Sequence, residues 1–232
     1  MTTMFAELPS RKSSPERLSS RAHTAPSVFI VAEDDYACRS LERLITTTGF
    51  NVERCGSTAE LLSLSRPDVP CCLLLDISPP GTNGLELQRQ VGARMDMPIV
   101  FITCRPDARV IVQAMKAGAV DVLVEPVNRE QLLSAVDAAI ELSRAALLRD
   151  ASLQQLRTYY ASVTPREREV VALVVSGLLN KQVGGELGIS EITVKAHRGQ
   201  VMRKMKAESL PHLVRMAARL NVVYPHSTTE FM

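Results

Sequence analysis

Between residues 28 and 143, five short strand-like runs alternate with five segments of helical periodicity, and this alternation limits the possible folds more than any other feature of the sequence. The runs are VFIVA (28–32), FNVER (50–54), CCLLLD (71–76), PIVFIT (98–103) and AVDVLV (119–124). Strands that alternate with helices pair in parallel and are covered by helices on both faces. The third and fourth runs are almost continuously apolar, which is typical of strands buried on both sides. We therefore predict an α/β, doubly wound domain with a five-stranded parallel sheet over these residues.

Residues 160–225 carry the start and stop signals of several short helices. The segment TPRE (164–167) combines a capping box with proline at the first helical position. A second helix is expected over 181–187, and Ser190 is expected to cap a third. Two helices joined by a short turn that contains glycine form a helix-turn-helix unit, whose second helix can enter the major groove of DNA. An all-α helix-turn-helix domain is thus predicted, preceded by a helical linker over 144–159.

Charge is divided unevenly between these two parts. The net charge is only +2, but residues 28–150 carry 12 basic and 17 acidic side chains, whereas residues 151–232 carry 11 basic and 6 acidic ones. Neutralised phosphates supply most of the non-specific affinity of proteins for nucleic acids. We therefore expect the C-terminal part to bind double-stranded DNA. Residues 1–27 and 226–232 are predicted to be tails, the first of them disordered because it has few apolar residues.

Apolar runs and cysteines indicate where the protein acts. The apolar runs are far shorter than the roughly 18 residues needed to span a bilayer, so no membrane partner is expected. The five cysteines include no CxxC pair, which argues against a zinc site or a disulfide framework. We predict a cytoplasmic protein with reduced, mostly buried thiols. A redox role for Cys104 would require that this residue is exposed.

Acidic residues gather where the predicted strands end, the edge at which doubly wound sheets bind their ligands. The polar residues expected there are Glu33, Asp34, Asp35, Asp76, Thr103 and Glu125. Mg²⁺ prefers one or two carboxylates together with water and a phosphoryl oxygen. The sequence therefore predicts a Mg²⁺ site at this edge, and solvated acids at the starts of loops are the alternative.

The segments LLLDISPPGTNGLEL (73–87) and AMKAGAVD (114–121) resemble the receiver domain of two-component response regulators. In that family, an aspartate that ends the third strand accepts a phosphoryl group from a histidine kinase. The resemblance implies that Asp76 is the phosphoacceptor and that Thr103 hydrogen-bonds the phosphoryl group. It also implies that a bound Mg²⁺ is held by Asp76, by Glu33 and by the backbone carbonyl of Ser78.

One departure from the receiver pattern lies after the first strand. Family members carry two adjacent acids there, and the alignment places Ala32 and Glu33 at these positions. A shift by one residue would restore an acidic pair, Glu33 and Asp34, but would require a bulge or a longer first strand. One metal-side carboxylate is therefore expected to be missing.

A second departure lies after the fifth strand, where the family lysine before a proline is replaced by Glu125. Two unit charges about 6 Å apart interact by roughly 3 kcal/mol at an effective dielectric of 20. Replacing attraction with repulsion is therefore expected to disfavour the phosphorylated state by roughly 5 kcal/mol. Val122 stands where the family usually has a switching aromatic residue, and the Glu125-Pro126 bond is expected to be cis, as in the family.

Periodicity separates two faces of the third C-terminal helix. The residues at spacings of three and four that we expect to be buried are Val194, His197, Val201 and Met205. The opposite face is basic and includes small side chains, which allows close approach to base edges. The residues expected to contact DNA are Lys195, Ala196, Gly199, Gln200 and Arg203 on this face, Arg198 on its flank, and Lys181, Ser190, Thr193 and Lys204 at phosphates.

The segments TPREREV, NKQV, ELGIS, TVKAHR and MRKM resemble the LuxR-type helix-turn-helix. Together with the receiver-like part they resemble the FixJ and NarL group of response regulators, and KAESLPHLVRMA is closer to the FixJ branch. The resemblance implies a transcriptional regulator that binds DNA as a homodimer, with a histidine kinase and RNA polymerase as further partners.

Other functions remain open at this stage. The receiver-like part could be gated by a partner, a ligand or a redox cue instead of phosphorylation, because its site departs from the family pattern. A protein-interaction adaptor without DNA binding is the alternative from another class, and the intact basic helix argues against it. We do not expect an enzyme, because a phosphohydrolase with Asp76 as nucleophile would need a second acid where Ser78 stands.

Overall fold

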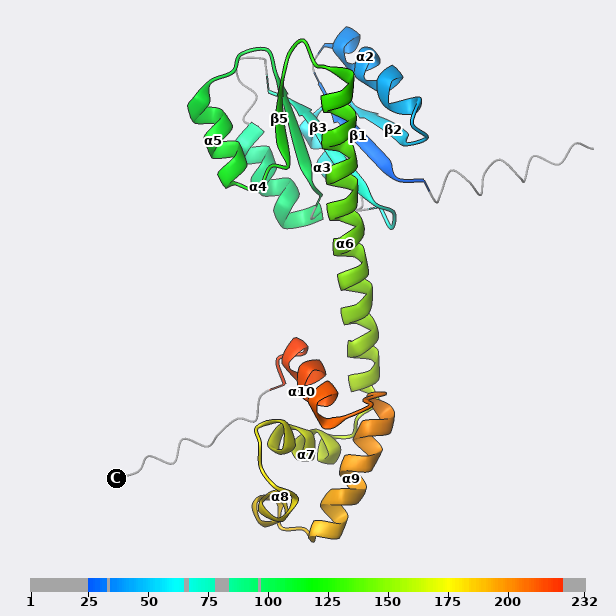
Figure 1. Cartoon of the computed structure of the whole chain (residues 1–232), viewed down its shortest axis with the longest axis vertical. Helices are drawn as coiled ribbons and strands as arrows, with labels where there is room; N and C mark the ends of the chain where they lie inside the picture. The colour runs from blue at the N-terminus through cyan, green and yellow to red at the C-terminus, as the bar shows by residue number, and fades with distance from the viewer. Residues whose placement is uncertain (1–24, 33, 65–66, 78–83, 96, 223–232) are drawn as a thin grey trace, which may run out of the picture. The chain divides into compact units, whose positions relative to one another are not determined.

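The computed structural model describes residues 25–32, 34–64, 67–77, 84–95 and 97–222 (Figure 1). The chain divides into two compact units, with the boundary between Leu147 and Leu148. The predicted tail over 226–232 lies outside the described residues, as does nearly all of 1–27, although Ser27 already belongs to the first strand.

The first unit contains a five-stranded sheet in which all neighbouring strands are parallel, as predicted. The strands are β1 (Ser27–Val31), β2 (Asn51–Cys55), β3 (Cys71–Asp76), β4 (Ile99–Thr103) and β5 (Asp121–Val124). Their order in the sheet is β2-β1-β3-β4-β5. The chain first builds outwards from β1 to β2 and then in the other direction from β3 to β5. The switch point therefore lies between β1 and β3, where sheets of this order bind ligands.

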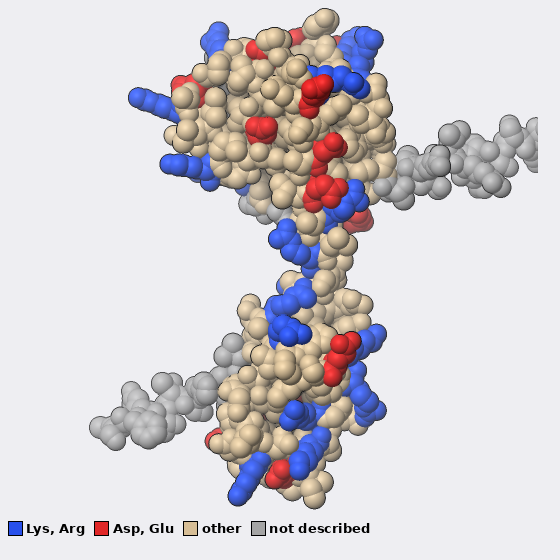
Figure 2. Space-filling view, viewed as in Figure 1, with Lys and Arg blue, Asp and Glu red and all other residues tan. Residues whose placement is uncertain are grey.

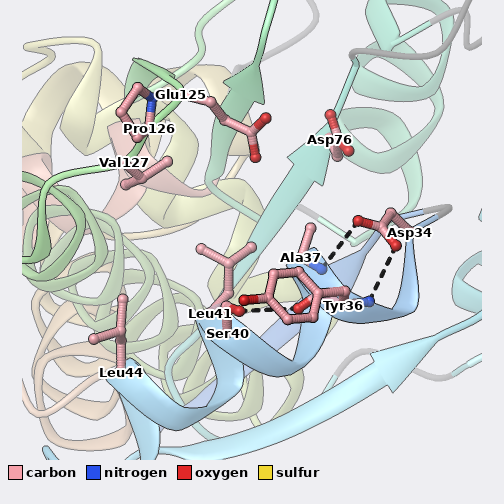
Figure 3. A pocket seen from close by; sticks show the side chains of 10 residues that line it. All are labelled: Asp34, Tyr36, Ala37, Ser40, Leu41, Leu44, Asp76, Glu125, Pro126 and Val127. Carbon is pink, nitrogen blue, oxygen red and sulfur yellow. Dashed lines mark hydrogen bonds between the residues drawn. The ribbon is translucent and has the colours of Figure 1, made fainter.

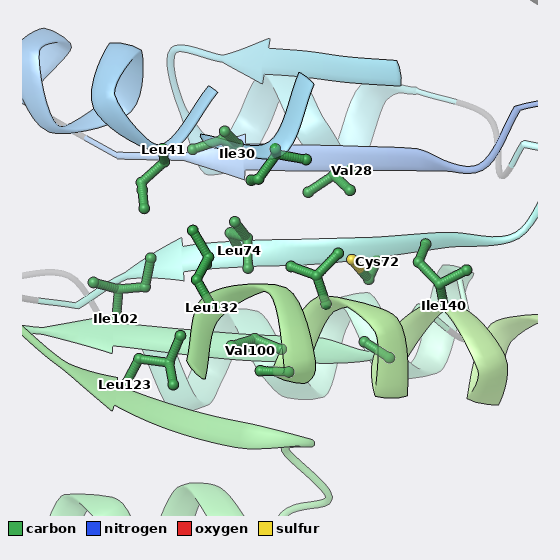
Figure 4. Close-up of a cluster of buried hydrophobic side chains, with 14 of the residues drawn as sticks. Val28, Ile30, Leu41, Cys72, Leu74, Val100, Ile102, Leu123, Leu132 and Ile140 are labelled. Carbon is green, nitrogen blue, oxygen red and sulfur yellow. The ribbon is translucent and has the colours of Figure 1, made fainter. Parts of the chain in front are cut away.

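Helices cover both faces of this sheet. Helices α2 (Asp35–Thr46) and α6 (Arg129–Ala161) pack on one face, and α3 (Thr58–Ser63), α4 (Gly84–Met95) and α5 (Ala108–Lys116) pack on the other. In β1, Val28 and Ile30 contribute to the first cluster (Figure 4), whereas Phe29 and Val31 contribute to the second. Because both faces are buried, the central strands need apolar residues at successive positions.

The second unit is helical, and the predicted linker belongs to α6. The further helices are α7 (Pro165–Val175), α8 (Asn180–Leu187), α9 (Glu191–Lys204) and α10 (Leu210–Arg219). One cluster of buried side chains joins the end of α6 to α7, α9 and α10, and another joins α7, α8 and α9. The capping box of Thr164 and Glu167 is present, with Pro165 in the first turn. Among the helices that the structure describes, none is both long and apolar enough to cross a bilayer.

Candidate functional site

A pocket of about 910 Å³ lies in the first unit beside the carboxyl end of β3 (Figure 3). Three carboxylates line it: Asp76 ends β3, Asp34 precedes α2 and Glu125 follows β5. The rest of the lining is mostly apolar or aromatic and consists of Tyr36, Ala37, Ser40, Leu41, Leu44, Pro126 and Val127. The structure therefore brings together three of the six polar residues that the sequence predicted for this edge.

The acids that follow β1 have local structural roles. The Asp34 carboxylate caps α2 by accepting hydrogen bonds from the backbone N–H of Tyr36 at 3.1 Å and of Ala37 at 3.3 Å. Asp35 forms ion pairs with Arg39 and Arg54. The hydrogen bond from Arg39 is the largest cause that lowers the pKa of Asp35. Both carboxylates thus stabilise the start of α2.

Strand β1 ends at Val31 and its pairing with β2 and β3 is regular. The longer strand or bulge that would align Glu33 and Asp34 with the family acids is therefore absent from the described residues. Ala32 directly follows the strand and is half-buried against the core. These observations support the alignment in which Ala32 replaces one of the two acids.

Glu125 follows β5 in an exposed turn. Its backbone N–H donates to the carbonyl of Thr103 at 2.9 Å, and the Glu125-Pro126 bond is cis, as expected. The Glu125 carboxylate points towards Asp76 across the pocket (Figure 3). An anion therefore occupies the side of the pocket where the receiver pattern has a lysine.

Thr103 ends β4 and is only 3% exposed. Its hydroxyl donates to the carbonyl of Arg105 at 3.2 Å and accepts from the N–H of Arg105 at 3.1 Å. The hydroxyl is thus held by the loop after β4. Val122, in place of the family's aromatic residue, is half-buried and packs against the core cluster on its side of the sheet.

The expected Mg²⁺ ligands are only partly described. Glu33 and Ser78 lie outside the described residues, which leaves Asp76 of the predicted set. Within the described ranges, no group of three or more histidine, cysteine, aspartate or glutamate side chains is arranged to hold a metal ion. Asp76 has the carboxylate chemistry that Mg²⁺ prefers, while Ala32 and Glu125 each make the surroundings less like a receiver's metal site.

The cysteines are free thiols. Four of them, Cys38, Cys55, Cys71 and Cys72, are buried, and Cys104 is exposed. Burial is the main cause that raises the pKa of Cys55 to about 11. Thiols with raised pKa values are poor nucleophiles at neutral pH, which indicates a structural role for Cys55. Cys104 has the exposure that a redox role requires, and that role stays a prediction.

In the second unit, a sharp turn joins α8 to α9. Gly188 ends α8 in the left-handed conformation, with φ of 65°. Ser190 then caps α9 as predicted, because its side chain accepts a hydrogen bond from the N–H of Thr193 at 3.1 Å. These two devices fix the angle at which α9 leaves the turn.

Helix α9 has the two faces that its periodicity predicted. Val194, Val201 and Met205 are buried, and His197 is half-buried. The residues of the predicted DNA-facing side are all exposed: Lys195, Ala196, Gly199, Gln200 and Arg203. Figure 2 shows many basic and few acidic side chains on the visible face of this unit. Helix α9 therefore presents to solvent a face that combines basic side chains with small residues.

Ion pairs involve two of the predicted DNA contacts. Lys195 pairs with Glu191 at 2.9 Å in an exposed setting. Lys204 pairs at 2.6 Å with Glu167, whose side chain is 6% exposed and also forms the capping box of α7. Lys204 thus joins α9 to α7, a role that sequence reasoning missed because the two residues are 37 positions apart.

Comparison with known proteins identifies the family of each part of the chain. Residues 28–137 match the response regulator receiver domain, and residues 161–217 match the bacterial regulatory proteins of the luxR family. Nodulation protein W of Bradyrhizobium diazoefficiens is 43% identical over 208 residues, which cover 89% of this chain and 91% of that protein. The chain belongs to the response regulators with a LuxR-type DNA-binding domain. It is a DNA-binding transcriptional regulator of the two-component type, and not an enzyme.

Two further relatives support this assignment. The transcriptional regulatory protein FixJ of Rhizobium meliloti is 38% identical over 193 residues, covering 82% of this chain and 94% of FixJ. The solved structure of the response regulator StyR is 39% identical, covers 84% of this regulator and 100% of StyR, and has a TM-score of 0.72. The predicted FixJ-like branch is therefore consistent with the named relatives.

Proposed function

We propose that the exposed face of α9 reads base edges in the major groove and that α8 and the start of α9 contact the DNA backbone. The observation that carries this proposal is the exposure of Lys195, Gln200 and Arg203 on one face, around the small residues Ala196 and Gly199. Lysine suits guanine and glutamine suits adenine. Other polar residues occupy positions from which they can reach phosphates. They are Lys181 in the first turn of α8, Ser190 at the cap of α9, and Thr193 and Arg198 on α9.

The receiver unit would regulate this DNA-binding unit. Asp76 is the proposed phosphoacceptor, a histidine kinase the phosphodonor, and Thr103 the group that would turn to bond the phosphoryl oxygen. Receiver domains generally bind Mg²⁺ at this place, and here Glu33, Asp76 and the carbonyl of Ser78 would hold the ion. Glu125 opposes the added phosphoryl charge, so DNA binding depends only weakly on phosphorylation.

DNA recognition by one short helix covers only a few base pairs. Two half-sites about one helical turn apart, read by a homodimer, would supply the remaining specificity. A cytoplasmic regulator of this kind would then act on RNA polymerase at the promoter. Footprinting on a site selected from random sequences tests the dimer, because protection of a single unrepeated half-site by a monomer would contradict it.

The experiment that tests the proposed function combines DNA binding with phosphorylation. The full chain and the Asp76→Asn variant are titrated onto the selected site with and without acetyl phosphate and Mg²⁺, while intact mass reports labelling. We expect slow labelling that Asp76→Asn abolishes, and DNA affinities that differ less than about threefold between the two proteins. The Lys195→Ala variant should lose roughly 1 to 3 kcal/mol at one base position. Rapid labelling coupled to a large gain in affinity would restore an ordinary phosphorylation switch.

A further inference from the structure

Ile192 is an apolar side chain on the surface of the DNA-binding unit. It lies in the first turn of α9 and is 80% exposed, the highest value among the large apolar residues that the structure describes. The N-terminal turn around it is held by the Ser190 cap and by the Glu191 to Lys195 ion pair. Ile192 is therefore presented to solvent by ordered backbone.

The position of Ile192 on α9 coincides with the proposed reading face. At 3.6 residues per turn, Ile192, Ala196, Gly199 and Arg203 fall within about 40° of one line along the helix, and Lys195 is about 60° from Ile192. The buried Val201 lies about 180° away on the same measure. Ile192 thus continues the row of proposed base contacts by one turn towards the start of the helix.

The surroundings of Ile192 indicate what it contacts. A single exposed apolar residue needs no explanation by itself, but this one lies in a row with Lys195 and Arg203 in a segment of net positive charge. The small side chains of Ala196 and Gly199 allow the helix to come close to a groove. The apolar group that a major groove offers is the 5-methyl group of thymine.

We propose that Ile192 is a specificity-determining residue that packs against the 5-methyl group of one thymine in each half-site. This inference rests on the proposed function, because it requires that the exposed face of α9 enters the major groove. It assigns an apolar contact to the position of that face with the largest side chain that can make no hydrogen bond to a base.

The test removes the methyl group from the DNA and the side chain from the protein. Each thymine of the selected site is replaced in turn by uracil, which lacks only the methyl group, and affinity is measured with the full chain and with Ile192→Ala. We expect about a fourfold loss at one thymine per half-site for the unaltered protein, the value for burying about one methyl group. For the Ile192→Ala variant, replacing that thymine by uracil should cause no loss of affinity. Because alanine is the better helix former, the variant is expected to fold.

Leu179 provides the matched control. It is 71% exposed at the start of α8, off the row on α9, and its side chain makes no capping hydrogen bond. Leu179→Ala should keep the full loss between thymine and uracil. Equal losses for the unaltered protein and Ile192→Ala, or no loss at any thymine, would overturn the inference while leaving DNA reading by α9 intact. Failure of the unaltered protein to select any sequence would overturn the proposed function as well.

Discussion

The carboxylates in the pocket of the receiver unit and the carboxylate of Glu167 in the helix-turn-helix have different electrostatic surroundings. In the helix-turn-helix, the nearly buried carboxylate of Glu167 receives hydrogen bonds from Lys204 and from the backbone of Thr164. In the receiver pocket, the carboxylates of Asp34, Asp76 and Glu125 line one space. The first arrangement stabilises a fixed fold, and the second disfavours the addition of a further negative group. If this difference governs function, the proposed phosphorylation of Asp76 is weaker than the receiver pattern implies, whereas the proposed DNA-binding face is unaffected.

The largest expected effect is that of charge reversal at Glu125. Glu125→Lys replaces repulsion of the phosphoryl group with attraction, a difference of several kcal/mol before solvent screening at this exposed position. We expect the rate at which acetyl phosphate labels Asp76 to rise at least tenfold. Intact mass spectrometry measures this labelling. Glu125→Gln, which only removes the charge, should lie between the two. Equal labelling of all three proteins would show that the pocket tolerates the anion and would remove the contrast between the two units.

The helix-turn-helix allows a test with two adjacent glycines. A Cβ atom at Gly184 would lie 2.7 Å from the carbonyl oxygen of Ile189, whereas a Cβ at Gly185 would meet nothing within 4 Å. Gly184→Ala should lower the free energy of unfolding by about 1 to 2 kcal/mol, because overpacking outweighs the gain in helix propensity. Gly185→Ala should raise it by up to about 1 kcal/mol. Urea denaturation of both variants measures the difference, and a stabilising Gly184→Ala would mean that the turn can widen to accept a Cβ atom at this position.

Much of this architecture could be predicted from the sequence. The parallel sheet followed from apolar runs such as 71–76, whose predicted bounds agree with those of β3, and the start of α9 followed from the cap at Ser190. These features depend on residues that are close in sequence. The pocket could be placed only at the level of strand ends, because the direction of the Glu125 side chain depends on packing.

Contacts between distant residues were not predictable. Lys204 was assigned to DNA phosphates from its charge and position, and its pairing with Glu167 became visible only when α7 and α9 were packed together. Ile192 could have been found from periodicity, since it lies three and seven residues before Lys195 and Gly199. Its side chain, however, is neither basic nor polar, and these are the properties by which a sequence pattern indicates contacts with DNA.

The Glu167 to Lys204 contact allows a further stability test within the second unit. Lys204→Met should lower the free energy of unfolding by about 1 to 2 kcal/mol, because it leaves the nearly buried carboxylate without its cation. Lys195→Met is the matched variant on the same helix, and its exposed ion pair should contribute at most about 0.5 kcal/mol. Denaturation in urea distinguishes the two. Equal effects would place Lys204 among the surface cations available to DNA, as its sequence position first indicated.

The smallest expected effect is a pH dependence that also originates at Glu167. Burial alone would raise the pKa of this carboxyl, but the hydrogen bonds from Lys204 and Thr164 outweigh it, so the pKa in the folded chain is lowered. A lowered folded-state pKa contributes stability that is fully present above the unfolded-state value, about 4.3, and is lost as the pH falls through the folded-state value. Glu167→Gln should therefore destabilise the second unit at neutral pH and lose less stability than the unaltered chain on acidification.

Thermal unfolding of the second unit followed from pH 7 to pH 3 measures this, with Glu169→Gln as a control because Glu169 is exposed and pairs only at the surface with Arg166. Parallel stability curves for Glu167→Gln and the unaltered chain would show that the carboxylate is not held in its charged form by these contacts, and the electrostatic contrast between the two units would then rest on the carboxylates of the receiver pocket alone.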